Sequence, residues 1–128
     1  MVPQPALIIL DHGSREAAAN ALVVEIAARV KIRRPGLIVE PAHMELASPS
    51  LNEAVSACQN QGARSIAVLP YFLAPGRHTK ETIPDQVAEI SQLYPSLDIQ
   101  IGEPLGCHDS LVDLLLERAK ALGESFDR

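Results

Sequence analysis

Hydrophobic residues along this chain alternate between short continuous runs and longer stretches with helical spacing. Four runs are apolar enough for buried strands, at residues 6–10, 37–42, 65–72 and 97–101. After each run, apolar residues recur every three or four positions, as they do on one face of a helix. Strands that alternate with helices predict an α/β fold, with a parallel sheet that is covered by helices on both faces.

The character of each strand predicts its place in the sheet. The first and third runs are the most apolar, as central strands are. The fourth run alternates apolar and polar residues, and the second carries Glu40 and Pro41, so both favour an edge. The sequence therefore predicts a flavodoxin-like doubly wound sheet of order 2-1-3-4, with residues 1–128 as a single domain.

Polar residues mark the starts of the predicted helices. For the second helix, either Ser50 and Glu53 form a capping box or Ser48 is the cap with Pro49 in the first turn. Thr82 is predicted to cap the third helix, with Pro84 in its first turn. Asp109 is predicted to cap the fourth helix, which carries an apolar stripe like the others.

The four histidines of the chain each follow one predicted strand: His12, His43, His78 and His108. In such a sheet, ligands bind outside the carboxyl ends of the strands, at the switch point between the first and third strands. His12 and His78 flank that point. Imidazole is a common metal ligand and accepts protons near neutral pH. Glu45 adds a carboxylate to the same edge, so the sequence predicts a metal or proton-transfer site there.

Structural alternatives exist for these residues. Histidine also favours polar loops, and His43 or His108 alone would fit a hydrogen-bonding residue at a helix end. The spacing is not that of a zinc ribbon or of an H-E-x-x-H helix. Asp11 is predicted either to orient His12 or to cap the loop.

Basic residues repeat the pattern on an acidic protein. The net charge is −5 and the sequence pI about 5.3, which argues against a nucleic-acid surface. Arg15, Arg77 and Lys80 nevertheless lie in the loops after the two central strands and predict an anionic ligand. The backbone amides of Gly13 and Ser14 are predicted to hold an anion as well.

Cysteine content and hydropathy predict a protein of the cytoplasm without a membrane span. Cys58 lies on an apolar helix stripe and is expected in the core, whereas Cys107 is rated structural or incidental. With no C-x-x-C pair, a reducing compartment is expected. The run at 6–10 is too short to cross a membrane. A chain from which a transit peptide has been removed would look the same, so an organelle stays open.

Four motifs together resemble the short CbiX/SirB family of sirohydrochlorin chelatases. They are "DHGSR" (11–15), "AHMELASPS" (42–50), "PYFLAPGRHTKETIP" (70–84) and "PLGCHDSL" (104–111). The resemblance implies a lyase of class II, which inserts a divalent metal into sirohydrochlorin without ATP. This tetrapyrrole bears acetate and propionate side chains. The family fold has two flavodoxin-like halves face to face, so the resemblance implies that this single half forms a homodimer.

The resemblance also implies roles for individual residues. His12 and His78 match the metal-binding histidines, and Glu45 matches the acidic residue after the second strand. The other predicted contacts are with the substrate, through Ser14, Arg15, Arg77 and Lys80 for the carboxylates and Phe72, Leu73 and Pro75 for the ring face. His43 and His108 stay as additional candidate ligands at the edge. No iron–sulfur cluster or other cofactor is expected, because the chain lacks the cysteine motif that some relatives carry.

Several alternatives remain open at this point. The form "AHMEL" resembles relatives that make siroheme, which favours Fe²⁺. Imidazole ligands also suit Co²⁺ or Ni²⁺, for cobalamin or a related tetrapyrrole. A carrier of metal or tetrapyrrole without catalysis is an alternative of another class, and a flavodoxin-like phosphate binder is a third. The phosphate binder would need Gly13 and Ser14 but not His78.

Overall fold

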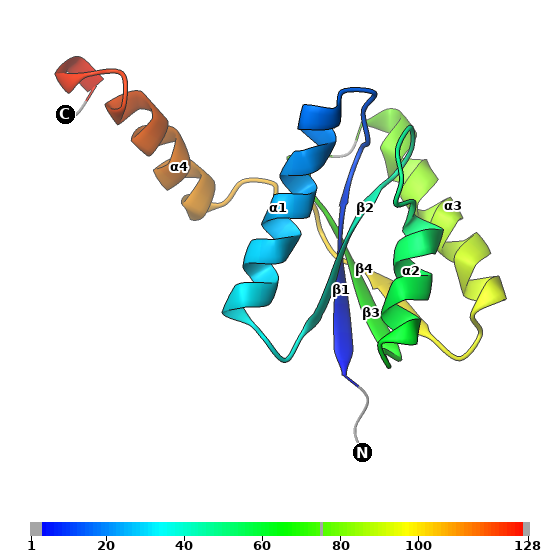
Figure 1. Ribbon diagram of the computed structural model, residues 1–128. Helices are drawn as coiled ribbons and strands as arrows, with labels where there is room; N and C mark the ends of the chain where they lie inside the picture. The colour runs from blue at the N-terminus through cyan, green and yellow to red at the C-terminus, as the bar shows by residue number, and fades with distance from the viewer. Residues whose placement is uncertain (1–3, 75, 127–128) are drawn as a thin grey trace.

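Strands and helices alternate along the whole chain, as the hydrophobic pattern predicts (Figure 1). The computed structural model describes residues 4–74 and 76–126, with His78 described by its backbone alone. The elements are β1 (Pro5–Asp11), α1 (Ala17–Arg33), β2 (Ile38–His43), α2 (Leu51–Asn60), β3 (Ser65–Pro70), α3 (Arg77–Leu93), β4 (Asp98–Ile101), α4 (Asp109–Lys120) and the short 3₁₀ helix η1 (Glu124–Phe126). No helix among the described residues is long and apolar enough to span a membrane.

The four strands form one parallel sheet in the order β2-β1-β3-β4, which confirms the predicted fold class and strand order. In the centre of the sheet, Ile8 of β1 lies between Glu40 of β2 and Val68 of β3. Strand β4 pairs with β3 over four residues, from Asp98 to Ile101. All carboxyl ends therefore meet at one edge of the sheet, at the top of Figure 1.

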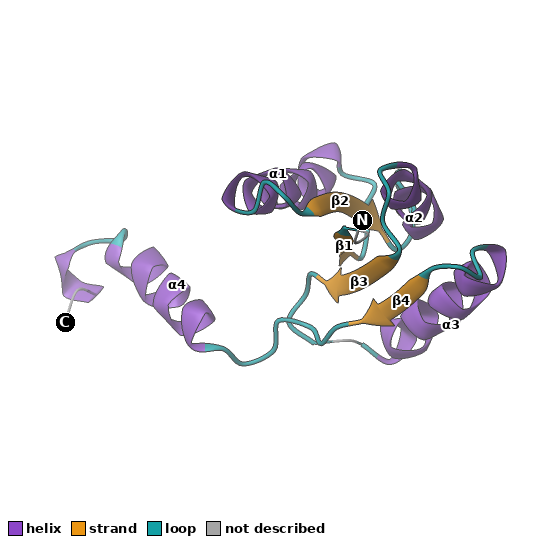
Figure 2. Cartoon of the chain, turned by 90° about the horizontal axis from the view of Figure 1, so that it is seen from below, coloured by secondary structure: helices purple, strands orange, loops and turns teal. Residues whose placement is uncertain are grey.

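The two faces of the sheet are covered unequally. Helices α2 and α3 pack on one face, where Ile8, Leu10 and Val68 are buried in the larger hydrophobic core. Helix α1 packs on the other face, where Ile9 and Val39 belong to a smaller core. Seen along the sheet, α1 lies over β1 and β2 and leaves the same face of β3 and β4 open (Figure 2).

Helix α4 does not cover the sheet, although α1 on one face and α2 and α3 on the other bear out the prediction of helices on both faces. It extends away from the body of the molecule, and the short η1 follows it (Figures 1 and 2). No residue of α4 is buried. Its apolar stripe predicts a helix correctly, but this helix is not packed on the sheet as the other three are.

The predicted helix starts are right for α2 and wrong for α3 and α4. The capping box of α2 is confirmed: the Glu53 amide donates to Ser50 Oγ (3.2 Å), and the Ser50 amide donates to the Glu53 carboxylate (3.0 Å). Helix α3 begins at Arg77, so Thr82 is not its cap and Pro84 lies inside it.

The extra turn of α3 has a local cause. The amide of Lys80 and the hydroxyl of Thr79 both donate to the carbonyl of Gly76, at 3.0 and 3.1 Å. Because Thr79 is buried, this turn is held before Pro84 removes one backbone donor further along. Helix α4 is capped by His108 rather than by Asp109.

Candidate functional site at the carboxyl edge of the sheet

The loop after β1 and the loop after β2 are joined by backbone hydrogen bonds. The Met44 amide donates to the carbonyl of Asp11 (2.9 Å), and the Glu45 amide donates to the carbonyl of His12 (3.1 Å). The side chains of His12 and Glu45 are both exposed at this edge. The structure therefore brings together the histidine and the carboxylate that the sequence singled out, one from each loop.

Gly13 makes this close approach sterically feasible. Its φ is +87°, in the region that favours glycine, and a Cβ at this position would lie 1.8 Å from the Glu45 carbonyl oxygen. Any side chain at position 13 would push the two loops apart. The glycine of "DHGSR" thus acts through the backbone and sets the distance between His12 and Glu45.

The loop after β3 reaches the same place through an aromatic contact. The rings of His12 and Phe72 are 4.8 Å apart between centroids and tilted by 44°. Phe72 also packs partly against the larger core, while Leu73 beside it is exposed. The imidazole therefore sits against a fixed aromatic side chain, next to an apolar surface.

The loop after β4 is hydrogen-bonded to the loop after β3. The amides of Leu105 and Gly106 donate to the carbonyls of Phe72 and Leu73, at 3.0 and 2.8 Å. His108 follows two residues later and caps α4, because the Ser110 amide donates to its Nδ1 (3.0 Å). The hydrogen-bonding alternative therefore describes His108, and one of its two ring nitrogens is already occupied.

His43 lies below the edge rather than on it. It is the last residue of β2, its side chain is 1% exposed, and its Nδ1 donates to Oδ1 of Asp11 at 2.6 Å. The same carboxylate oxygen accepts from the Gly13 amide (3.0 Å). Asp11 therefore holds His43 and the turn of the loop. The interpretation that it orients His12 is wrong, and His43 is a buried hydrogen-bonding residue rather than an exposed ligand.

The predicted anion cradle is also wrong for this arrangement. The Gly13 amide donates to Asp11, and the Ser14 amide donates to Oδ1 of Asn20 (2.9 Å). Asn20 donates in return to the Ser14 carbonyl (2.7 Å). No role was predicted for Asn20 from the sequence. The available signal was an amide side chain one turn into a helix, where it can reach back to the preceding loop.

The basic residues lie around the same edge. Arg15 is exposed before α1, and Arg77 and Lys80 are exposed in the first turn of α3. The backbone of His78 belongs to that turn, but its side chain lies outside the described part of the chain, as does Pro75. Among the side chains that the structure describes, no three of His, Cys, Asp or Glu gather to hold a metal ion.

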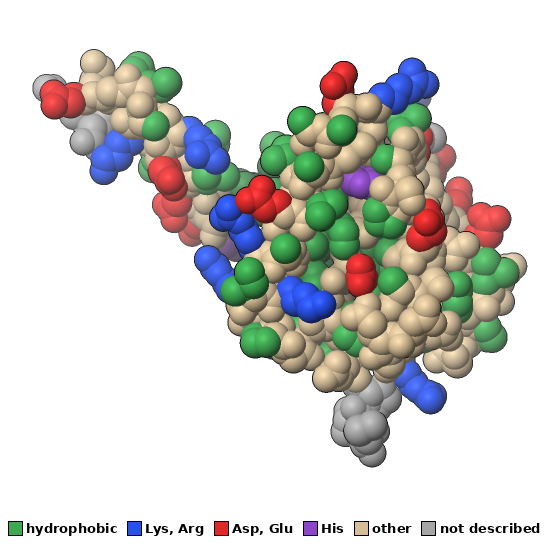
Figure 3. All heavy atoms as spheres, in the orientation of Figure 1, with side chains coloured by type: hydrophobic (Ala, Val, Ile, Leu, Met, Phe, Trp, Pro, Cys, Tyr) green, Lys and Arg blue, Asp and Glu red, His purple; other side chains and the backbone are tan. Residues whose placement is uncertain are grey.

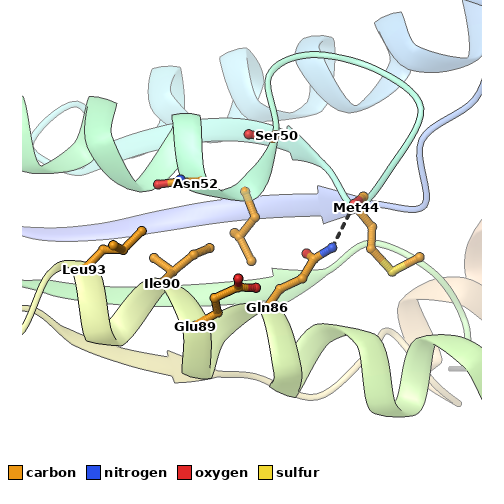
Figure 4. A pocket seen from close by; sticks show the side chains of 8 residues that line it. Met44, Ser50, Asn52, Gln86, Glu89, Ile90 and Leu93 are labelled. Atoms are coloured by element: carbon orange, nitrogen blue, oxygen red, sulfur yellow. Dashed lines mark hydrogen bonds between the residues drawn. The ribbon is translucent and has the colours of Figure 1, made fainter.

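A pocket of about 250 Å³ opens elsewhere, between α2 and α3 (Figure 4). Its lining residues are Met44, Ser50, Leu51, Asn52, Gln86, Glu89, Ile90 and Leu93. Nε2 of Gln86 donates to the Met44 carbonyl (3.0 Å), which fixes this side chain across the pocket. None of the candidate site residues lines it, so the pocket is separate from the edge that carries His12.

Comparison with known proteins agrees with the motifs. The profile of the CbiX family matches residues 6–122. The chain is 42% identical to the chloroplastic sirohydrochlorin ferrochelatase of Arabidopsis thaliana, over 88% of this chain and 50% of that protein. It is 32% identical to the sirohydrochlorin cobaltochelatase of Methanocaldococcus jannaschii, over 89% of this chain and 96% of that protein.

The fold of this chain also matches that of a solved structure. The chain superposes on SirB from Bacillus subtilis with Fe³⁺ at a TM-score of 0.84 and 30% identity, over 94% of this chain and 48% of that chain. It thus spans about half the length of the Arabidopsis and Bacillus relatives. Because the family profile extends from β1 to beyond the end of α4, the chain belongs to the CbiX family.

Proposed function

We propose that this chain is a sirohydrochlorin chelatase that inserts Fe²⁺ into the macrocycle without ATP to give siroheme. One observation carries the proposal: His12 and Glu45 meet at the carboxyl edge of the sheet, joined through their backbones. An imidazole that binds a divalent metal, beside a carboxylate, fits the chemistry of metal insertion. The relative from Arabidopsis, at 42% identity, is named a ferrochelatase.

Metal insertion requires that two pyrrole N–H protons leave as the metal enters. In the proposal, His12 and His78 hold the incoming metal, and a histidine or Glu45 accepts the protons. The ring contact with Phe72 restricts the imidazole of His12, and this side chain is exposed at the edge of the sheet. Phe72 and Leu73 support the face of the macrocycle, which is flat and largely apolar.

The carboxylates of the substrate need positive charge on a protein whose net charge is −5. Arg15, Arg77 and Lys80 are exposed at this edge and supply it. Because Arg side chains bind carboxylates in a bidentate manner, the two arginines are the stronger candidates. Ser14 adds a hydroxyl beside Arg15. These contacts bind substrate throughout the reaction.

A second candidate is insertion of Co²⁺. The observation that favours it is the length of the Methanocaldococcus jannaschii relative, a cobaltochelatase of which this chain covers 96%. Imidazole and carboxylate ligands suit Fe²⁺, Co²⁺ and Ni²⁺ alike, so ligand type does not separate these metals.

We propose further that the chain works as a homodimer in the cytoplasm. The sheet edge of one chain can contact only one face of the macrocycle. A macrocycle that is bound on both faces needs the sheet edge of a second chain. Analytical ultracentrifugation of the active protein tests this point. A monomer at concentrations that give full activity would contradict it.

The test of the activity is an absorbance assay with sirohydrochlorin and Fe²⁺, Co²⁺ or Ni²⁺ in turn, without ATP. Repeated turnover, fastest with Fe²⁺, is the expected result. Fastest turnover with Co²⁺ would favour the second candidate. Binding of sirohydrochlorin or metal without turnover would instead identify a carrier.

Variants separate the two groups of residues. We expect His12→Ala and His78→Ala each to lower kcat by roughly 10²-fold or more, as loss of general-base catalysis does. Arg77→Ala should instead raise KM, and more strongly at low salt, because a partly exposed charge pair is screened. If Arg77→Ala lowered kcat with an unchanged KM, Arg77 would belong to the catalytic group rather than to substrate binding.

A further inference from the structure

The peptide group between Met44 and Glu45 is hydrogen-bonded on both sides. Its carbonyl accepts from Nε2 of Gln86 (3.0 Å), and its amide, which belongs to Glu45, donates to the carbonyl of His12 (3.1 Å). Because a trans peptide is planar and its C=O and N–H groups point in opposite directions, these two bonds hold one plane from opposite sides. The direction in which the Glu45 side chain leaves the backbone is therefore tied to Gln86.

The peptide group after Glu45 is also restricted. Gly13 brings the loop after β1 against the Glu45 carbonyl oxygen, where a Cβ would lie only 1.8 Å away. Leu46 has a φ of +69°, a conformation that residues other than glycine rarely adopt. Glu45 is thus held through its backbone on both sides, although its own side chain is exposed at the edge of the sheet.

Gln86 connects this peptide group to the helix that carries other candidate residues. It lies in α3, which begins at Arg77. The buried side chains of Ile83 and Val87 anchor α3 in the larger hydrophobic core. Apolar packing is not directional, whereas a hydrogen bond restricts both a distance and an angle. The bond from Gln86 therefore fixes the position of α3 relative to the loop that carries Glu45.

The hydrogen bond of Gln86 has a cost in stability. Its amide points Nε2 at the Met44 carbonyl (Figure 4), because the reverse orientation would place two acceptor oxygens together. In this orientation Oε1 is buried and has no hydrogen-bond partner among the described residues. A buried acceptor without a partner is unfavourable. An apolar side chain of the same length would avoid this cost, so stability alone does not explain a glutamine at this position.

We propose that Gln86 is a positioning residue for metal insertion, which holds Glu45 in place through the Met44 carbonyl. Gln86 lines the pocket between α2 and α3, apart from the edge that carries His12, so it acts through the backbone rather than on the substrate. The inference rests on the proposed function, in which Glu45 is a candidate proton acceptor beside the metal. Placement of such a group changes the rate of the chemical step more than it changes substrate binding.

The first test does not depend on activity and measures hydrogen exchange of the Glu45 amide by NMR. Gln86→Met keeps the length of the side chain but removes both the donor and the unpaired oxygen. We expect the Glu45 amide to exchange roughly tenfold faster in this variant, because a peptide group held from one side opens more often. Unchanged exchange of the Glu45 amide would overturn the proposal.

Glu89→Gln is the matched control for this measurement. Glu89 follows Gln86 by three residues in α3 and lines the same pocket. Acidic side chains are exposed over α2 and α3 in Figure 3, and Glu89 is an exposed residue. Its replacement should leave both the exchange of the Glu45 amide and the turnover at their wild-type values.

The second test measures turnover of sirohydrochlorin. We expect Gln86→Met to lower kcat by roughly tenfold or more, as loss of a residue that orients a group at a metal site does. KM should stay close to that of wild type, because the exposed arginines still bind the carboxylates. The midpoint of urea unfolding should also change little, since a hydrogen bond and an unpaired acceptor are lost together. A wild-type kcat would contradict the proposal, and so would a loss of kcat that merely follows a loss of folded protein.

A double variant decides whether Gln86 acts through Glu45. Glu45→Gln removes the proposed proton acceptor, so Gln86→Met should have no further effect on kcat in that background. Effects on kcat that multiply would show that Gln86 does not act through Glu45 and would overturn the proposal.

Gln86→Glu keeps the question open to test if Gln86→Met does not fold. It preserves the shape of the side chain but places an oxygen against the Met44 carbonyl, so faster exchange and a lower kcat are expected again. Unchanged exchange and kcat in this variant would overturn the proposal. If wild type did not turn over sirohydrochlorin, the proposed function would fail, and the exchange of the Glu45 amide would still decide whether Gln86 holds this peptide group.

Discussion

Asp11→Ala removes the acceptor that two parts of the site share. Oδ1 of Asp11 accepts from Nδ1 of His43 (2.6 Å) and from the amide of Gly13 (3.0 Å). The His43 side chain is 1% exposed, so water cannot replace the lost partner without a change in structure. We therefore expect the variant to lose stability and to loosen the loop that carries His12.

The magnitude follows from these contacts. A hydrogen bond to a charged group contributes about 1.5–3 kcal/mol, and a buried ring nitrogen left without a partner costs about 1–3 kcal/mol. These two figures describe the same bond and are not summed in full. The Gly13 amide is only partly buried and can bond to water instead. We expect Asp11→Ala to lower the free energy of unfolding by about 2–4 kcal/mol, which is large beside the 5–15 kcal/mol of a typical domain.

Urea unfolding followed by circular dichroism measures this change, with linear extrapolation to zero denaturant. Arg15→Ala is the matched control, because Arg15 is exposed in the same loop and its loss should cost within about 0.5 kcal/mol. A double-mutant cycle with His43→Gln isolates the pair. A loss below about 0.5 kcal/mol for Asp11→Ala, or additive effects in the cycle, would refute the reasoning.

Three further predictions concern the glycine, the thiols and the capping box. Gly13→Ala should cost about 1–3 kcal/mol in urea unfolding, because its φ is +87° and its Cβ would meet the Glu45 carbonyl; a neutral result would show that the loops are not held together. In the native protein a thiol reagent should react with the exposed Cys107 alone, because burial raises the pKa of Cys58 to about 12 and the charge of Glu40 adds to the shift. Unfolding in urea should make Cys58 reactive as well. Rapid reaction of both thiols in the native protein would contradict this prediction. Hydrogen bonds from the Ser50 amide and from the hydroxyls of Ser48 and Ser50 lower the pKa of Glu53. The ionised carboxylate therefore stabilises the fold at a pH above its usual pKa, and this contribution is lost as the pH falls through the folded-state pKa. The Tm of wild type and the Tm of Glu53→Gln should differ at neutral pH and converge in acid.

The strand order could be predicted because the composition of a strand reflects how many of its faces are buried. The first and third runs are continuously apolar, and they are the two central strands. Glu40 and Pro41 interrupt the second, which is an edge strand. Neither inference needed a long-range contact, since each depends only on how many faces of a strand meet solvent.

Pairings between loops could not be predicted in the same way. The bond between Asp11 and His43 joins residues 32 apart in sequence, and it exists only because the ends of β1 and β2 are neighbours in the sheet. The sequence pattern suggested His12 as the partner of Asp11, because it is the next residue along the chain. The start of α3 was misplaced for a related reason, since the hydrogen bonds from Thr79 and Lys80 to the Gly76 carbonyl leave no sequence signal as strong as a proline.

Helix α4 shows where periodicity stops being informative. An apolar stripe predicts that a helix forms and that Leu111, Leu115 and Leu122 need apolar neighbours, because their exposure to water is unfavourable. It does not say which surface supplies those neighbours, because spacing along a helix describes only the helix itself. That choice depends on the reach of the connection. The Gly106 amide is bound to the Leu73 carbonyl and α4 starts at Asp109, so only Cys107 and His108 connect α4 to the loop after β4.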